Sequence, residues 1–135
     1  MKASRNHDKI KILIVDDSAL NRRNMSDILT NEGFNVVGSA ANAEEGMQLL
    51  HTAKANVIFI DVVMPEISGL EFAKVIQDKV AGEKFIIMMS SLTIESVIIE
   101  SISNGATDFL QKPFERDDLL KCMEKVEKIL DKENR

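Results

Sequence analysis

The segment Ile12-Leu-Ile-Val-Asp-Asp-Ser18 is the most informative part of this chain for its fold, and it raises the first question about its chemistry. Its four apolar residues are typical of a short buried strand. Two adjacent carboxylates then follow at the point where that strand would leave the core. Ser18 is a favourable N-cap, so a helix is expected to begin directly after the acids. Two acids this close repel each other, and something must make their placement favourable.

Strand-like and helix-like segments alternate along the whole chain. Five short aliphatic runs are predicted as strands, at residues 10–15, 34–38, 57–60, 85–89 and 107–110. Helical spacing of apolar residues follows each of them, beginning near Ser18, Asn42, Gly69, Thr93 and Glu115. Five such units predict an α/β fold, a doubly wound five-stranded parallel sheet with helices on both faces. The runs at 57–60 and 85–89 are apolar throughout, as a sheet covered on both sides requires.

Composition limits the classes of protein that this chain can belong to. Its 135 residues fit one domain, and the formal net charge of −5 gives no electrostatic footprint for nucleic acid. No stretch approaches the roughly 18 apolar residues of a membrane span. The single cysteine, Cys122, favours a reducing compartment. We therefore expect a cytoplasmic protein without membrane insertion, with a flexible tail at residues 1–8, a single domain at 9–135 and no output domain.

Polar residues follow the predicted strands, at the edge of the sheet where α/β proteins bind ligands. They are Asp16 and Asp17 after the first strand, Asp61 after the third, Ser90 after the fourth and Lys112 after the fifth. Two like charges about 4 Å apart cost on the order of 4 kcal/mol at an effective dielectric constant near 20. Three converging acids therefore require a cation. Because the ligands are all hard oxygens, Mg²⁺ is the natural choice, with Mn²⁺ as an alternative.

The order and spacing of these residues resemble the receiver domains of two-component response regulators, the CheY-like family. The resemblance covers nearly the whole chain. It rests on Val15-Asp16-Asp17-Ser18, Asp61-Val-Val-Met-Pro-Glu-Ile-Ser-Gly69, Met89-Ser90-Ser91, Gly105-Ala106 and Lys112-Pro113-Phe114. It implies the flavodoxin-like strand order 2-1-3-4-5. It also implies a signalling protein that promotes only its own phosphorylation and dephosphorylation, and is not otherwise an enzyme.

The resemblance also assigns roles to individual residues. Asp61 would accept a phosphoryl group from a histidine kinase or a histidine phosphotransfer protein. Mg²⁺ would be held by Asp16, Asp17, Asp61 and the backbone carbonyl of Val63. Lys112 and the Ser90 hydroxyl would contact phosphoryl oxygens, and a cis Lys112–Pro113 bond would aim the ammonium into the site.

The resemblance further implies output through protein contacts on the face made by the fourth helix, the fifth strand and the fifth helix. The candidate switch and output residues are Ser90, Phe109, Ile94 and Ile98. The fourth helix carries more apolar residues than one narrow stripe can bury, which favours a partner surface. A target of the chemotaxis or motor type and a phosphorelay intermediate are both compatible with this pattern, as are a monomer and dimerisation on activation.

Three other functions compete with this interpretation. A metal-dependent phosphohydrolase on the same fold would place a second acid two residues after the nucleophile, where this chain has Val63. A flavin or nucleotide binder would need a phosphate loop after the first strand, where Asp16 and Asp17 would repel anions. A receiver-like binding module that is never phosphorylated would not need the complete set of site residues.

The first helix carries Asn21 and Asn24 at positions where apolar contacts would be expected. We interpret both as facing solvent or a docking partner. The resemblance implies docking of a kinase or phosphotransfer helix here, with Leu20 and Met25 as candidate contacts, but an ordinary helix surface on which these two residues are anchors in the core is favoured.

Overall fold

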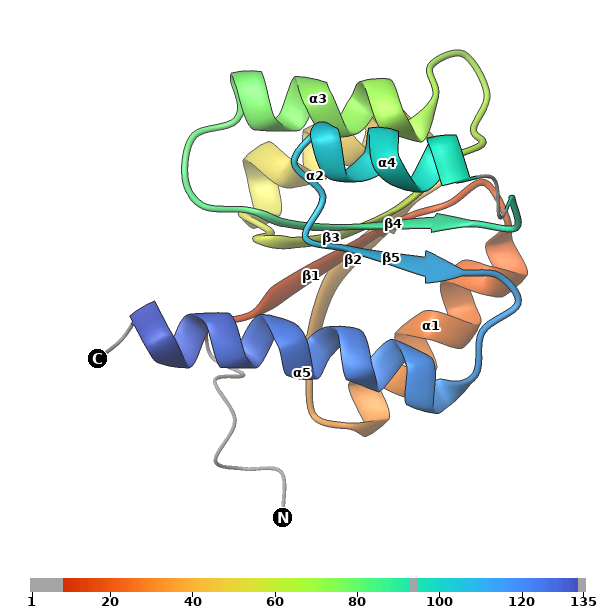
Figure 1. The fold of residues 1–135 in the computed structure, drawn as a ribbon. Helices are drawn as coiled ribbons and strands as arrows, with labels where there is room; N and C mark the ends of the chain where they lie inside the picture. The colour runs from red at the N-terminus through yellow and green to blue at the C-terminus, as the bar shows by residue number, and fades with distance from the viewer. Residues whose placement is uncertain (1–8, 93–94, 134–135) are drawn as a thin grey trace.

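The computed structural model describes residues 9–92 and 95–133, and in it strands and helices alternate strictly. The elements are β1 (Lys11–Val15), α1 (Ala19–Asn31), β2 (Asn35–Ala40), α2 (Ala43–Ala53), β3 (Val57–Asp61), α3 (Gly69–Lys79), β4 (Phe85–Ser90), α4 (Glu95–Ser103), β5 (Asp108–Gln111) and α5 (Arg116–Glu133). All paired strands are parallel, in the order β2-β1-β3-β4-β5. Helices α1 and α5 cover one face of the sheet, and α2, α3 and α4 cover the other (Figure 1). The predicted fold class and strand order are confirmed.

Each of the three central strands divides its side chains between two separate cores. In β1, Ile12 and Ile14 pack toward α1 and α5, whereas Leu13 and Val15 pack toward α2 and α3. The same alternation holds in β3 and β4. Successive side chains of a strand point to opposite faces, so a sheet with two covered faces needs apolar residues at every position.

Capping residues set the helix boundaries close to where the sequence predicts them. The side chains of Ser18, Asn42 and Ser68 accept hydrogen bonds from backbone N–H groups in the first turns of α1, α2 and α3. Gly33 follows α1 with a φ of 89°, which a residue with a Cβ adopts only with strain. The first and last residues of all five strands agree with the sequence prediction to within two residues.

The expected tail at residues 1–8 lies outside the described residues. Across 9–92 and 95–133, every helix is too short or too polar to cross a bilayer. The parallel strands end at one edge of the sheet, and this edge carries the residues that the sequence singles out.

Candidate functional site

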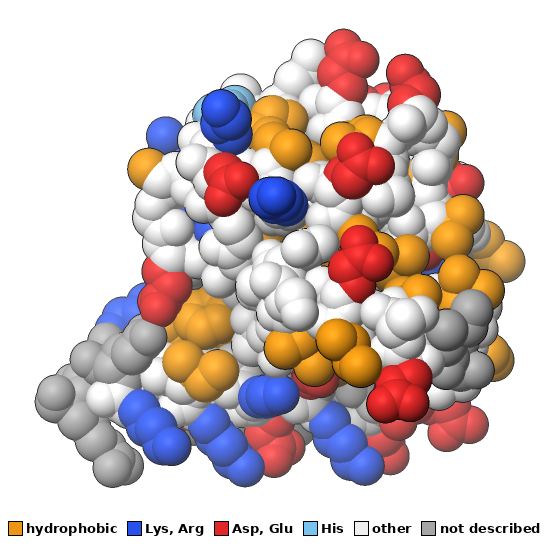
Figure 2. Space-filling view, turned by 45° about the horizontal axis from the view of Figure 1, so that its top comes forward, with side chains coloured by type: hydrophobic (Ala, Val, Ile, Leu, Met, Phe, Trp, Pro, Cys, Tyr) orange, Lys and Arg blue, Asp and Glu red, His pale blue; other side chains and the backbone are white. Residues whose placement is uncertain are grey.

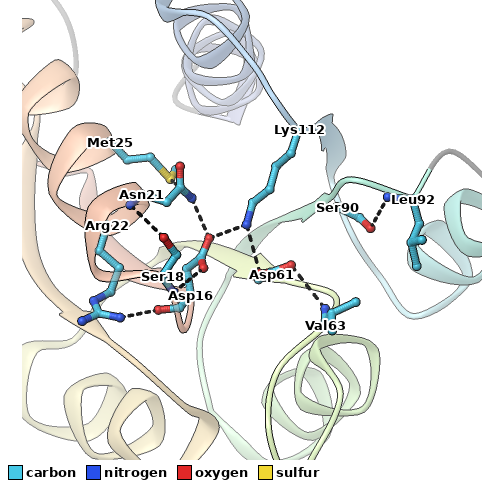
Figure 3. Close-up of polar contacts among 10 residues, drawn as sticks. All are labelled: Asp16, Ser18, Asn21, Arg22, Met25, Asp61, Val63, Ser90, Leu92 and Lys112. Carbon is cyan, nitrogen blue, oxygen red and sulfur yellow. Dashed lines mark hydrogen bonds and ion pairs between the residues drawn. The ribbon is translucent and has the colours of Figure 1, made fainter.

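Four strands bring their terminal side chains together at this edge (Figure 3). Asp16 directly follows β1, Asp61 is the last residue of β3, Ser90 the last of β4, and Lys112 directly follows β5. Because β1 lies between β2 and β3, and β4 between β3 and β5, these four positions are neighbours in space although they are far apart in the sequence.

The three carboxylates converge as the sequence predicts. Asp16, Asp17 and Asp61 each place an oxygen within 4.8 Å of the others. Asp16 and Asp61 are buried, and Asp17 is exposed. Ligand oxygens at opposite corners of a magnesium octahedron lie about 4.2 Å apart, twice the usual metal–oxygen distance. Small side-chain movements would therefore bring all three carboxylates onto one hard cation, so the donor set fits Mg²⁺ or Mn²⁺.

Lys112 supplies the positive charge at the centre of the cluster. Its ammonium Nζ lies 2.7 Å from Asp16 Oδ2 and 3.0 Å from Asp61 Oδ2. The Lys112–Pro113 bond is cis, as predicted. One ammonium thus bridges the two buried carboxylates, and it is within reach of any group that Asp61 would carry.

The favourable interaction of Asp61 with Lys112 does not fully offset the cost of burying the Asp61 carboxylate beside Asp16. Burial raises the pKa of Asp61 above its usual value, and the nearby Asp16 carboxylate adds to this effect, while Lys112 opposes it. For Lys112, burial alone would lower the pKa. Its hydrogen bonds to Asp16 and Asp61 outweigh that effect and raise the pKa, so the ammonium stays charged.

The loop after β3 packs tightly against the backbone of Asp61. The Val63 N–H donates to Asp61 Oδ1 at 3.2 Å, and the Gly69 N–H donates to the Val62 carbonyl at 2.8 Å. A Cβ atom on Gly69 would lie 2.0 Å from the Asp61 carbonyl oxygen, a distance that no relaxed structure tolerates. Only glycine fits there. The metal-binding role of the Val63 carbonyl stays a prediction.

Ser90 is fully buried, and its hydroxyl belongs to the loop after β4. Ser90 Oγ accepts a hydrogen bond from the Leu92 N–H at 2.9 Å, and in Figure 3 the side chain points toward Leu92. A hydroxyl that accepts one bond still has its own proton to donate. Ser90 therefore lies at the edge of the site in a position from which its contacts can change.

Two candidate output residues that the structure describes, Phe109 and Ile98, lie on β5 and α4. Phe109 and Ile98 are half-buried, and Ile94 lies outside the described residues. Ile99 and Ile102 expose 55% and 60% of their surface, so α4 does carry more apolar residues than it buries. Figure 2 shows apolar side chains exposed among charged ones, with Lys and Arg side chains spaced along the lower edge of the view.

On α1, Met25 is the core anchor that the favoured interpretation expects, whereas Leu20 is 80% exposed and Asn21 does not simply face solvent or a partner. Asn21 turns back to the site, where its Nδ2 donates to Asp16 Oδ2 at 2.6 Å. Met25 is fully buried in the core and is not available to a docking partner. Arg22, which the sequence analysis did not single out, donates from Nη1 to the Asp16 carbonyl at 2.6 Å. An amide five residues after a buried acid, in the first turn of the following helix, is the signal that could have identified Asn21.

Cys122 does not add a nucleophile to the molecule. The thiol lies in the core between α5 and β5, and burial, together with the nearby Asp108, raises its pKa to about 12. A thiol with so high a pKa is almost wholly protonated at neutral pH and is a poor nucleophile.

Comparison with known proteins agrees with the geometry. The family described as response regulator receiver domain matches residues 12–124. The chemotaxis protein CheY of Thermotoga maritima is 35% identical, over 87% of this chain and 98% of that protein. A CheY-like receiver domain protein of Methanospirillum hungatei superposes with a TM-score of 0.83 at 27% identity, covering 92% and 98% of the two chains. CheY of Borrelia burgdorferi, in a complex with CheX, BeF₃ and Mg²⁺, gives a TM-score of 0.81 at 27% identity and covers 93% and 96%.

Proposed function

The chain belongs to the family of response regulator receiver domains, and on this premise we propose that Asp61 is its phosphoacceptor. The donor would be a phosphohistidine on a histidine kinase or a histidine phosphotransfer protein. Receiver domains of this kind are signalling proteins and not classical enzymes. The proposed product is a phosphoaspartate whose consequences are read by other proteins.

The chemistry of the transfer matches the groups around Asp61. An oxygen of the Asp61 carboxylate attacks the phosphorus, the nitrogen–phosphorus bond of the phosphohistidine breaks, and its electron pair returns to the imidazole. The Lys112 ammonium lies 3.0 Å from Asp61 Oδ2, so it would be close enough to stabilise the negative charge that develops on a phosphoryl oxygen. Asp16, Asp17, Asp61 and the Val63 carbonyl would hold Mg²⁺, which would neutralise further charge on the phosphoryl group.

The observation that carries this proposal is the convergence of Asp61, two further carboxylates and one lysine at a single sheet edge. The related CheY of Borrelia forms its complex with CheX together with BeF₃ and Mg²⁺. BeF₃ has the size and charge of a phosphoryl group, so its binding by a relative supports a phosphoryl-binding role for the acidic edge of this chain.

Phosphorylation adds about two negative charges next to a lysine and a buried serine. We propose that the Ser90 hydroxyl then leaves the Leu92 N–H and donates to a phosphoryl oxygen. That change would favour a different conformation of the half-buried Phe109 and Ile98. The shape of the face made by α4, β5 and α5 would change with them. The partner would dock on this face. The CheY–CheX complex shows that a related protein assembles with another chain. We place these exchanges in the cytoplasm, which the single buried thiol favours.

A phosphohydrolase remains the second candidate, but the geometry gives it less support. It needs a general acid beside the nucleophile, and the residue two positions after Asp61 is Val63, whose side chain is 59% exposed and cannot donate a proton. A binding module that is never phosphorylated is disfavoured because the buried carboxylates are costly to keep without a function.

Phosphorylation can be tested with acetyl phosphate and Mg²⁺, followed by the intact mass of the protein. We expect the mass to rise by one phosphoryl group in the parent chain. Asp61→Asn or a chelator should abolish that gain. Asp78→Asn, the same change at an exposed aspartate of α3, should leave it intact. A phosphoryl group that Asp61→Asn still acquires would overturn the assignment.

A further inference from the structure

Asp16 is held by more hydrogen bonds than any other carboxylate described at this edge. Its Oδ1 accepts from the Ser18 N–H at 2.9 Å. Its Oδ2 accepts from both Asn21 Nδ2 at 2.6 Å and Lys112 Nζ at 2.7 Å. The side chain is completely buried, so these donors take the place of the water that surrounds an exposed acid.

Three of these residues form a closed ring at the start of α1 (Figure 3). The Asp16 carboxylate accepts from the Ser18 N–H, and Ser18 Oγ accepts from the Asn21 N–H at 3.2 Å. The Asn21 side chain then donates back to the second oxygen of Asp16. The carboxylate is bonded through both oxygens to one helix turn, so its plane cannot rotate without breaking the ring.

Two further contacts prevent the ring from moving as a unit. Arg22 Nη1 donates to the Asp16 backbone carbonyl at 2.6 Å, which ties the same helix turn to the end of β1. Asn21 Nδ2 also contacts Sδ of the buried Met25 at 3.6 Å, so the amide is anchored on the core side as well. Asn21 is thus the link through which the core and α1 hold Asp16 Oδ2.

We propose that Asn21 is a positioning residue of the cation site, which keeps the Asp16 carboxylate turned toward Asp61 and Lys112. This inference rests on the proposed function, because it assumes that Mg²⁺ binds between these acids. Hydrogen-bond partners of metal ligands contribute about 10-fold to 100-fold to metal affinity. Asn21 matches that description because its Nδ2 donates to Asp16, which would be a ligand of the cation.

The surroundings of Asn21 determine which substitution tests this role. Asn21 lines an open groove of about 460 Å³ with Ser18, Asn24, Ser91, Lys112, Pro113 and Phe114. Truncation to alanine would let water from the groove take the place of the lost donor. Leucine has the same branching and number of side-chain heavy atoms as asparagine, is bulkier and donates nothing, so Asn21→Leu excludes water and removes the side-chain donor to Asp16 Oδ2 and Met25 Sδ.

The experiment measures Mg²⁺ affinity by calorimetry for the parent chain, Asn21→Leu, Asn21→Gln and Asn24→Leu. We expect Asn21→Leu to bind Mg²⁺ about 10-fold more weakly than the parent. Asn21→Gln retains a donor and should lose much less. Asn24→Leu makes the same change one turn further along α1, on the wall of the same groove, and should bind as the parent does.

A spectroscopic measurement separates positioning from a general effect on folding. In ¹⁵N-labelled protein without metal, the Ser18 amide reports the orientation of Asp16, to which it donates. We expect its resonance to shift in Asn21→Leu and to stay in place in Asn24→Leu. Equal Mg²⁺ affinity in Asn21→Leu and Asn24→Leu would overturn the role of Asn21. Failure of the parent chain to bind Mg²⁺ would instead overturn the proposed function.

Discussion

The acidic side of the site and its α4 side are built in opposite ways. The acidic side, made of Asp16, Asp17, Asp61 and Lys112, rests on buried strand ends and is tied together by side-chain hydrogen bonds. On the α4 side, which runs from Ser90 through α4, Ser101 is the only buried residue among those described in α4. Rigid placement would serve the proposed phosphoryl transfer to Asp61, and looser packing would allow the surface around α4 to change after that transfer.

Truncation of one apolar residue on each side should give the largest difference. Met25→Ala removes a fully buried side chain of α1, and we expect it to lower the free energy of unfolding by about 3 kcal/mol. Ile102→Ala removes a side chain that is 60% exposed, and its effect should stay below about 0.5 kcal/mol. Urea unfolding followed by circular dichroism measures both. Similar losses in the two variants would mean that α4 is packed as firmly as α1.

Removal of the bridging ammonium should have the next largest effect. Lys112→Met leaves Asp16 and Asp61 buried without their common donor, and we expect a loss of about 2 kcal/mol in the absence of divalent cations. Mg²⁺ should restore more stability to this variant than it adds to the parent, because it replaces the missing charge.

The control for this substitution is Lys125→Met. Lys125 is an exposed lysine whose ammonium lies 3.9 Å from Asp108, and its replacement should cost less than about 0.5 kcal/mol. A Lys112 variant that is as stable as this control would show that the acidic side does not depend on its lysine.

The smallest expected effect is the dependence of stability on pH that comes from the buried Asp61 carboxyl. Because the pKa of Asp61 is raised in the folded state, its contribution to stability is present below its ordinary value of 3.8. That contribution is lost as the pH rises through the folded-state pKa. The neutral side chain of Asp61→Asn avoids the loss, so without divalent cations this variant should be more stable than the parent at pH 7. The gain should shrink as the pH falls toward 4.

Urea unfolding between pH 4 and pH 7 tests this, with Asp78→Asn as the exposed counterpart. That variant changes an aspartate at the surface of α3, away from the acidic side of the site, and should not reproduce the gain of Asp61→Asn at pH 7. An Asp61→Asn variant that is less stable than the parent at neutral pH would mean that the ion pair with Lys112 outweighs burial.

Much of the fold follows from local patterns. The continuous apolar runs of β3 and β4 predict a sheet covered on both sides, because alternate side chains must enter two cores. Ser18, Asn42 and Ser68 mark helix starts because each satisfies backbone N–H groups that the first turn leaves free. These signals act within a few residues, so local sequence is enough to carry them.

The roles of Asn21 and Met25 show where this reasoning ends. Both lie on the first helix, and helical spacing does not show whether a side chain bends toward a strand end or toward solvent. Asn21 reaches Asp16 because only residues 16–18 separate β1 from α1, and Ser18 caps the first turn of that helix. Met25 is buried because α1 and α5 close over the same face of the sheet.

Local sequence is sufficient for the alternation of strands and helices, and it places acids, a serine and a lysine at the strand ends. Two features arise only when the elements pack together: the Lys112 ammonium lies between two buried carboxylates, and Met25 is buried where α1 and α5 close over the same face of the sheet. The physical reason is range. Periodicity and capping act between neighbours in the chain, whereas a contact such as that of Asp16 with Lys112 joins residues 96 positions apart and exists only once the sheet has formed.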